Sequence, residues 1–318
     1  MRFASSISNL ALVLALVFAP GCGRDEAPAA SASSGGEAGA ARAPFVWRVD
    51  GGTGPSYLLG TIHVAVPLRD ALPSELMPTL ESARVVMLEI DASSQAVTPE
   101  EIARHGMIQA GPTLEQRLTP TQWNSLVTEL QPLGFPAAAL AQMRPWLPAM
   151  TLLIARTSAL PDASATVGPN GQPIPMDSEV LNSARERNAA LRFLETPGEQ
   201  LALLSGIGEE PMTEWLIEMI DQPEKAEAQL RKMIAAYRAG DAAALEEVVF
   251  DEEELAEHPE YHEALFTTRN RAWVPALREE LARGGAFVAV GVGHFLGPDG
   301  LVALLAREGL TLERLPAR

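Results

Sequence analysis

The chain has 318 residues, a formal net charge of −17, 47% hydrophobic residues and 20% charged residues. This composition is that of an ordinary globular protein with a substantial core, and it excludes a disordered chain. The acidity argues against non-specific nucleic-acid binding, which needs a basic surface.

The N-terminus has the layout of an export signal. Arg2 precedes the apolar stretch LALVLALVFAP, which is too short to span a bilayer comfortably. The single cysteine, Cys22, directly follows small residues, as in a bacterial lipoprotein signal whose cysteine is lipidated. Residues 1–21 are therefore predicted to be a lipoprotein-type signal peptide. An ordinary cleaved signal with an unrelated cysteine is the alternative.

The next segment, residues 22–43, is rich in Ala, Ser, Gly and Pro and cannot build a core, so it is predicted to be a flexible tether. Residues 44–318 are the predicted folded domain. We expect an exported protein of the periplasm or cell envelope that meets the membrane through its lipid anchor only.

The folded domain is predicted to begin with a β-hairpin and to alternate strands with helices thereafter. Helices are expected at 73–83, within 98–156, at 177–188, at 197–207, within 211–283 and at 299–309. Asp177 is expected to cap its helix. Strands are expected at 45–52, 56–65, 84–91, 190–196, 287–297 and 310–316, and a loop at 161–175.

This order predicts an α/β (or mixed α+β) domain, with a small central mixed β-sheet surrounded by many helices. The chain has no P-loop, no dinucleotide-binding G-x-G-x-x-G after a strand and no G-x-S-x-G elbow.

Polar side chains follow four of the predicted strands. His63 and His294 each stand in a G-x-x-H motif after an apolar run, although they are about 230 residues apart and the chain has only five histidines. Glu89 and Glu195 follow two further runs. In open α/β sheets ligands gather at the carboxyl ends of the strands. Two imidazoles and two carboxylates form a suitable shell for a divalent metal such as Zn, Mn, Co or Fe.

Each residue also has a purely structural explanation. His63 can be a half-buried core histidine, and His294 can cap a loop. Glu89 can pair with an arginine, and Glu195 can favour the start of the helix that follows. The repetition of G-x-x-H favours the functional interpretation.

The other three histidines stand in two different settings. His258 and His262 have the i, i+4 spacing of a helical metal pair, but Pro259 and the acidic surroundings favour a solvated helix face. His105 precedes a glycine, as a helix C-terminal residue does.

The segments YLLGTIH, VVMLEID, MRPW, LRFLETPGEQ, AYRAGD, TTRNRAW and VAVGVGHFLGPDGLVALL occur in this order. Together they resemble the TraB/GumN family, which includes the TIKI metalloproteases with their paired G-x-x-H motifs. The likeness covers about residues 45–315. It implies a fold akin to the erythromycin-esterase and ChaN-like proteins.

The resemblance also implies a site built from His63, Glu89, Glu195 and His294, with Arg269 and Asn270 of the R-N-x-x-W stretch reaching it. Arg144 of MRPW is a weaker candidate, for which a structural role beside Trp146 is the alternative. The segment GPNGQPIPMD is longer than the family's usual turn, which leaves the match of Asp177 open.

Three functional hypotheses follow. The first is a divalent-metal-dependent hydrolase of peptide or protein substrates, with Mn, Co or Zn held by His63, Glu89 and His294. In it Glu195 is a base or further ligand, Arg269 stabilises an oxyanion and Asn270 orients the substrate or a ligand. The second is an esterase-like hydrolase without a metal, in which a carboxylate holds His63 while it activates water. The third is a lipid-anchored metal- or ligand-binding protein without turnover.

Overall fold

A computed structural model describes residues 44–63, 66–91, 97–160, 166–168, 173–250 and 259–316. The predicted signal peptide, Cys22, the tether and His258 lie outside these residues. In the described part, no helix is both long enough and apolar enough to cross a bilayer.

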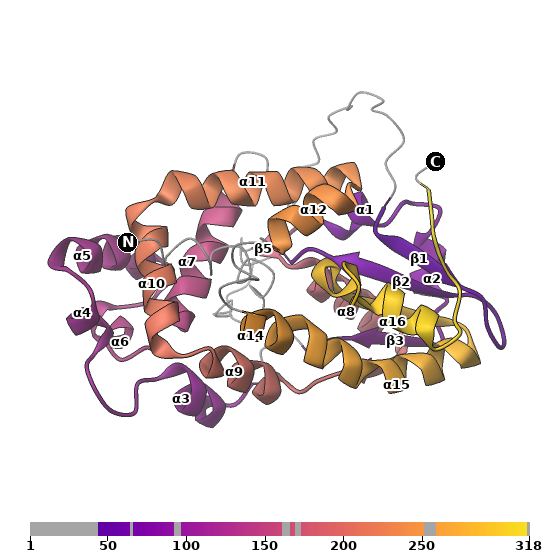
Figure 1. The fold of residues 1–318 in the computed structure, drawn as a ribbon, viewed down its shortest axis with the longest axis horizontal. Helices are drawn as coiled ribbons and strands as arrows, with labels where there is room; N and C mark the ends of the chain where they lie inside the picture. Colours follow the sequence, from indigo (N-terminus) through magenta and orange to yellow (C-terminus); the bar gives the residue numbers. More distant parts are fainter. Residues whose placement is uncertain are drawn as a thin grey trace.

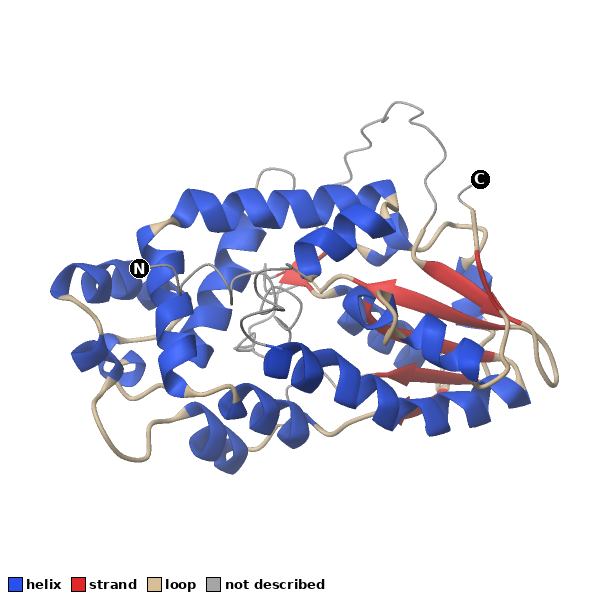
Figure 2. Cartoon of the chain, in the orientation of Figure 1, coloured by secondary structure: helices blue, strands red, loops and turns tan. Residues whose placement is uncertain are grey.

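The fold is mixed α/β, as predicted, and Figure 2 shows strands gathered in one half and helices throughout. Its strands are β1 (Val46–Val49), β2 (Ser56–Thr61), β3 (Val85–Leu88), β4 (Thr166–Val167), β5 (Pro173–Ile174), β6 (Ala190–Phe193), β7 (Ala286–Gly291) and β8 (Leu312–Arg314).

The α-helices in the described residues are α1 (Leu68–Ala71), α2 (Met77–Glu81), α3 (Pro99–Gly106), α4 (Leu114–Arg117), α5 (Pro120–Leu130), α6 (Ala137–Leu140), α7 (Trp146–Ala159), α8 (Met176–Glu186), α9 (Pro197–Gly206), α10 (Glu209–Asp221), α11 (Pro223–Ala239), α12 (Ala242–Val249), α14 (Pro259–His262), α15 (Thr268–Arg283) and α16 (Leu301–Arg307). The described residues also contain two 3-10 turns, η2 (Gln131–Leu133) and η4 (Val292–Phe295), and one π-helical segment, η3 (Glu263–Thr267).

The main sheet has the strand order β6-β3-β7-β2-β1-β8. The four strands from β6 to β2 are parallel, whereas β1 is antiparallel to both β2 and β8. All residues of β3 and β7 are buried, as expected for strands in the middle of a parallel sheet. The predicted N-terminal hairpin is therefore confirmed as β1 and β2, and its second strand joins the parallel part.

Helices cover the sheet and also form a separate helical half of the molecule. Helix α8 packs on β3 and β7, and α15 packs on β7 and on α16. In Figure 1, α15 and α16 lie in front of the sheet, while α5, α7 and α10 pack together beyond its carboxyl ends. The parallel strand ends thus face the helical half, which places any site there between the two halves.

Local sequence rules explain most helix boundaries. Helices α3, α4, α5 and α9 begin with capping boxes. In each, the threonine side chain accepts the backbone N–H of the third helical residue, and the Glu or Gln side chain of that residue accepts the threonine backbone N–H. Proline occupies an early position in three of these helices. Gly240, at φ +66°, ends α11.

Several details differ from the sequence predictions, and the strand predicted at 287–297 ends at Gly291 and gives way to the 3-10 turn η4. Helix α2 is shorter than predicted, and α16 begins at Leu301, because Gly297 adopts a left-handed φ of +70° and Gly300 is the cap. The segment predicted as a loop contains the two-residue ladder between β4 and β5. Helix α8 begins after Pro175, and Asp177 does not cap it.

Candidate functional site

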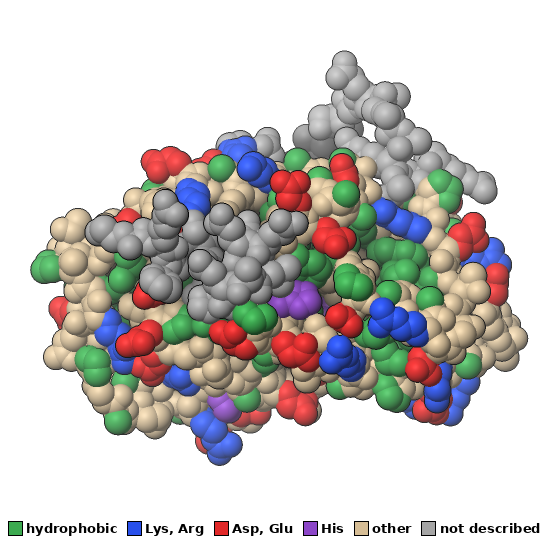
Figure 3. Space-filling model, viewed as in Figure 1, with side chains coloured by type: hydrophobic (Ala, Val, Ile, Leu, Met, Phe, Trp, Pro, Cys, Tyr) green, Lys and Arg blue, Asp and Glu red, His purple; other side chains and the backbone are tan. Residues whose placement is uncertain are grey.

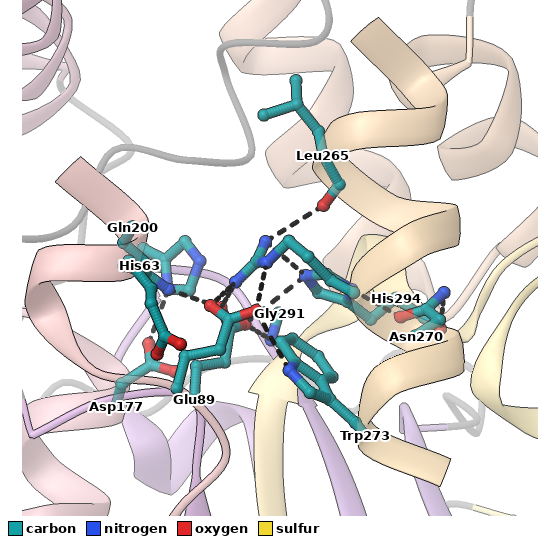
Figure 4. A network of polar contacts seen from close by, with 12 residues as sticks. His63, Glu89, Asp177, Gln200, Leu265, Asn270, Trp273, Gly291 and His294 are labelled. Carbon is teal, nitrogen blue, oxygen red and sulfur yellow. Dashed lines mark hydrogen bonds and ion pairs between the residues drawn. The ribbon is translucent and has the colours of Figure 1, made fainter. Parts of the chain in front are cut away.

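The four residues predicted from the strand ends do come together. Glu89 directly follows β3, and Glu195 follows β6 by two residues. His63 follows β2, and His294 lies in η4 directly after β7. These are the four neighbouring parallel strands of the sheet. Hydrogen bonds through Arg269 join Glu89, Glu195 and His294, and His63 with its own partner Asp177 lies beside this group at Gly291. The whole set is called the polar network below, and it extends onto α8, α9 and α15 (Figure 4).

The two G-x-x-H motifs lie against each other. Because β2 and β7 are parallel neighbours, Thr61 pairs with Gly291 in the register of the sheet. A Cβ at Gly60 would approach the Val292 side chain to 2.9 Å, which is too close for any side chain to be tolerated without movement. The first glycine of one motif thus makes room for the second motif, and this contact brings the two histidines to the same edge.

Arg269, on α15, connects most of the network. Its Nε and Nη2 atoms donate to the two oxygens of Glu195 at 2.8 and 2.9 Å, and Nη2 also donates to Glu89 Oε2 at 2.7 Å. Its Nη1 atom donates to the carbonyl of Leu265 at 3.0 Å and to Nε2 of His294 at 3.1 Å. An arginine has five N–H donors. In this arrangement none of them remains for a substrate.

The carbonyl that Arg269 uses lies in the π-helical segment η3, directly before α15. Single π-turns within helices occur frequently at functional sites. Here the segment precedes both Arg269 and Asn270 and supplies Leu265 as an acceptor for the first of them.

Glu89 is a buried carboxylate that accepts three hydrogen bonds. Oε1 accepts the backbone N–H of Gly291 at 2.7 Å, and Oε2 accepts Arg269 together with Nε2 of Gln200 at 3.1 Å. Burial alone would raise the pKa of Glu89, but the charge of Arg269, the two histidines and the Gly291 N–H together outweigh it and hold the pKa at about 2. Glu89 is therefore ionised at neutral pH and is a poor proton acceptor.

Glu195 serves chiefly to hold Arg269. Its Oε1 accepts the indole N–H of Trp273 at 3.0 Å as well as Arg269, and its Oε2 accepts Arg269 again. The Trp273 ring lies under the guanidinium, with 4.8 Å between Cζ and the ring centre. This contact adds a cation–π attraction to the ion pair.

His294 is held between an amide and the guanidinium. Its Nδ1 lies 2.7 Å from Asn270 Oδ1, and the Asn270 amide nitrogen donates to the carbonyls of His294 and Asp299. Nδ1 therefore carries the hydrogen, and Nε2 accepts from Arg269. Burial, against the opposing charge of Glu89, lowers the pKa of His294 to about 3, so the ring is neutral.

His63 has a carboxylate partner of its own. Nδ1 lies 2.6 Å from Asp177 Oδ2, and the hydroxyl of Thr61 donates to the other oxygen, Oδ1, at 2.7 Å. Burial alone would lower the pKa of His63, but the charge and hydrogen bond of Asp177 outweigh it and raise the pKa above its ordinary value. These contacts explain why Asp177 does not cap α8: its carboxylate faces β2 instead.

The other ring nitrogen of His63 differs from the rest of the network. Among the described residues, Nε2 of His63 has no hydrogen-bond partner. It lies close to Gly291, where a Cβ would come within 3.3 Å of this nitrogen and 3.2 Å of Glu89 Oε1. The glycine thus leaves a small gap beside Nε2. His63 is the one histidine of the network whose second nitrogen is uncommitted within the described structure.

Sequence reasoning missed three members of the network as site residues, namely Asp177, Gln200 and Trp273. From its position before an apolar helical pattern, Asp177 is expected to be a helix cap, and the long segment before it leaves its match to the family open. Gln200 and Trp273 stand in the motifs LRFLETPGEQ and R-N-x-x-W that carried the resemblance, but neither was assigned a role.

Other polar candidates lie outside this network. His262 packs edge-on against Phe250 and contacts the hydroxyl of Thr267. His105 contacts Ser205. Arg144 donates to the carbonyl of Ser205 and pairs with Glu209, which fits the structural role weighed for it.

A divalent metal held by His63, Glu89 and His294 would need lone pairs on all three. Glu89 already accepts three N–H groups, and Nε2 of His294 accepts one from Arg269. Within the described residues, no group of three or more His, Cys, Asp or Glu side chains is arranged to hold a metal. His294 therefore cannot share a cation with His63 and Glu89 while Arg269 keeps its contact with Nε2, whereas Oε1 of Glu89 accepts only the Gly291 N–H and has a lone pair left.

The fold and the network define an α/β protein with a buried histidine, carboxylate and arginine site at the carboxyl ends of parallel strands. The chain belongs to the TraB/PrgY/gumN family, whose profile matches residues 45–314. This confirms the resemblance carried by the motifs.

A protein of Treponema pallidum (strain Nichols), described as an uncharacterized protein, is 25% identical over 284 residues, which cover 83% of this chain and 80% of that protein. No solved structure matches the chain significantly. The predicted likeness to erythromycin-esterase and ChaN-like folds stays a prediction.

Proposed function

We propose that the protein is a hydrolase that activates water with His63. The observation that carries this proposal is the pair of contacts at the His63 ring: Nδ1 is fixed to Asp177 at 2.6 Å, while Nε2 has no partner among the described residues. A general base needs such an orienting partner on one nitrogen and a free lone pair on the other. His294, by contrast, has both nitrogens engaged.

In this mechanism Nε2 of His63 takes a proton from water as the water oxygen bonds to a substrate carbonyl carbon. Asp177 keeps the hydrogen on Nδ1 and stabilises the imidazolium that forms. The same proton then passes to the leaving group as the carbonyl re-forms. Glu89, Glu195 and Arg269 neutralise one another in part and hold the edge of the site rigid, which is a positioning role.

The bond that is cleaved is proposed to be a peptide bond, with a peptide or protein as substrate, and an ester is the alternative. Family membership supports the general proposal, and the substrate class rests on the resemblance to the TIKI metalloproteases. A protein tethered outside the cell through Cys22 would meet its substrates in the periplasm or cell envelope, which is likewise a proposal.

A metal-dependent hydrolase is a second candidate, favoured by one observation. Both imidazoles have Nδ1 held by an oxygen, so that Nε2 faces the network, which is how metal-binding histidines are usually oriented. A bound metal would lower the pKa of a coordinated water. His294 would join His63 and Glu89 in holding it only if Arg269 moved away from Nε2 of His294. A binding protein without turnover is the third candidate.

The test is turnover of a panel of chromogenic esters and peptide anilides by the wild type, His63→Ala and His105→Ala. The His105→Ala variant is the control. It removes a histidine of α3 whose ring makes its one hydrogen bond among the described residues with Ser205. We expect wild-type and His105→Ala turnover to agree and His63→Ala turnover to fall by at least about 100-fold. Equal turnover in all three proteins would refute the role of His63. Measurable ligand affinity without any turnover would favour the binding protein.

A further inference from the structure

Gln200 is a buried amide in the network that the proposed mechanism does not yet use. It lies in the first turns of α9, whose start is fixed by the capping box of Thr196 and Glu199. Its side chain is only 5% exposed, although glutamine is usually a surface residue. Its side chain makes one hydrogen bond with the described residues, in which Nε2 donates to Glu89 Oε2 at 3.1 Å.

This contact does not explain why Gln200 is buried. Glu89 Oε2 already accepts the shorter, charged bond from Arg269, and Oε1 accepts the backbone of Gly291. A neutral amide donates two N–H groups and accepts through its oxygen. Gln200 therefore keeps one N–H and its oxygen free of partners among the described residues. The Gln200 oxygen is not one of the fully buried unpaired atoms of the described residues, so a ligand or water can reach this amide and complete its hydrogen bonds.

Gln200 and His63 adjoin the same carboxylate. Glu89 Oε2 binds the Gln200 amide, and Glu89 Oε1 borders the gap at Gly291 that also touches Nε2 of His63. Figure 4 shows Gln200 and His63 on the same side of the network, away from His294 and Asn270. The two side chains with unused hydrogen-bonding capacity thus adjoin the two oxygens of one carboxylate, which makes the space beside Glu89 the candidate position for a substrate.

The charges around this position indicate what it accepts. Glu89, Glu195 and Asp177 contribute three carboxylates, and Arg269 contributes one guanidinium whose donors are all engaged. An anionic group such as a phosphate or a carboxylate would meet net negative charge here and, among the residues that the structure describes, no free cation of the network. A neutral carbonyl oxygen needs only one N–H donor, which an amide can supply.

Resting on the proposed hydrolase, we propose that Gln200 binds the carbonyl oxygen of a neutral ester or amide substrate beside His63. The free N–H of Gln200 donates to this oxygen. As the water oxygen bonds to the carbonyl carbon and its proton passes to His63, the carbonyl π electrons move onto the oxygen. Gln200 then donates to the resulting oxyanion. The first functional hypothesis gives this role to Arg269.

The experiment compares oxygen esters with the matching thionoesters, in which sulfur replaces the carbonyl oxygen and accepts hydrogen bonds weakly. Full-length wild type, Gln200→Leu and Gln229→Leu are assayed with both substrates. Gln229→Leu makes the same change at a partly buried amide on α11, beside Leu153 and Trp215. Loss of one such donor costs about 100-fold in kcat. We expect that loss with the oxygen ester in Gln200→Leu, and a much smaller loss with the thionoester.

The ratio of the oxygen-ester rate to the thionoester rate distinguishes a Gln200 that binds the substrate from a Gln200 that only holds Glu89 in place. A purely structural Gln200 would slow both substrates equally, and an unchanged ratio in Gln200→Leu would therefore overturn the inference. Wild-type rates in Gln200→Leu, together with turnover that is lost in His63→Ala, would overturn the inference and leave the hydrolase standing. Absence of His63-dependent turnover with every substrate would overturn both.

Discussion

The Nδ1 atom of His63 lies 2.6 Å from a carboxylate oxygen of Asp177, although the two residues are 114 positions apart in the chain. The hydroxyl of Thr61 donates to the second oxygen of the same carboxylate. Asp177 thus has one oxygen for the histidine and one for the strand that carries it, so the imidazole has a fixed orientation.

Replacement of Asp177 by Asn should lower turnover by at least about 100-fold, because an amide neither stabilises the imidazolium nor enforces the tautomer. Asp177 raises the pKa of His63, and only the neutral ring accepts a proton. Wild-type turnover should therefore rise with pH through a midpoint above 6.5, and the midpoint should move lower in Asp177→Asn.

The measurement is kcat/KM from pH 5 to 9, with Asp91→Asn as the control. Asp91 pairs with Arg185 outside the network, so its variant should keep the wild-type midpoint. A midpoint that is the same in Asp177→Asn and in the wild type would contradict the pairing.

Replacement of Arg269 by Ala should have two effects. It leaves the carboxylates of Glu89 and Glu195 buried without their cation, which should destabilise the protein by about 3–5 kcal/mol in chemical unfolding. It also frees lone pairs of Glu89 and His294. We expect Arg269→Ala to bind Zn²⁺ or Mn²⁺ stoichiometrically in elemental analysis after dialysis.

The wild type should hold no stoichiometric divalent metal under the same conditions and should keep its turnover in the presence of a chelator. Arg271→Ala, which removes an exposed neighbouring arginine, is the matched control and should behave as the wild type. Loss of wild-type turnover in chelator, with recovery on addition of a metal, would establish the metal-dependent candidate instead.

Glu89 should make the free energy of unfolding depend on pH in the acidic range. Its pKa in the folded protein is about 2, below the ordinary 4.5, so its contribution is complete above pH 4.5 and is lost as the pH falls toward 2. The pH-dependent part amounts to about 3 kcal/mol. The unfolding free energy of the wild type should therefore fall more steeply between pH 5 and 3 than that of Glu89→Gln.

Urea unfolding at several pH values measures this difference. Glu308→Gln, which alters a surface ion pair with Arg278, should follow the wild-type curve. Parallel curves for the wild type and Glu89→Gln would show that the surroundings do not lower the pKa of Glu89.

Gly291→Ala should reduce activity by filling the gap beside His63. The added Cβ would approach Glu89 Oε1 to 3.2 Å and His63 Nε2 to 3.3 Å, so these groups must shift by a few tenths of an ångström. We expect at least about a tenfold loss of turnover, because active groups tolerate little displacement. Thermal unfolding and turnover are measured together.

Gly206→Ala provides the comparison, because a Cβ there meets no atom within 4 Å. Alanine in this last helical position of α9 should be neutral or stabilise by about 0.5–1 kcal/mol, with unchanged turnover. If Gly291→Ala retained wild-type turnover, the position beside Nε2 would not be where the reaction takes place.

The local sequence was enough to predict much of the fold. Apolar runs such as VVML and FVAV predict buried strands, since this pattern acts within a few residues. The ends of α2, α8 and α16 were less well predicted. Their boundaries depend on contacts made elsewhere, as with Asp177, or on a glycine conformation, as at Gly297.

By itself, the sequence determined the α/β class, the family and the gathering of His63, Glu89, Glu195 and His294 at one edge, because parallel strands end on the same side. Only the tertiary structure decided how these groups share their hydrogen bonds. Arg269 approaches from α15, Asp177 from α8 and Gln200 from α9, and their distances to the strand ends are set by long-range packing. That packing commits every donor of Arg269 to the protein and leaves one nitrogen of His63 without a partner in the described structure.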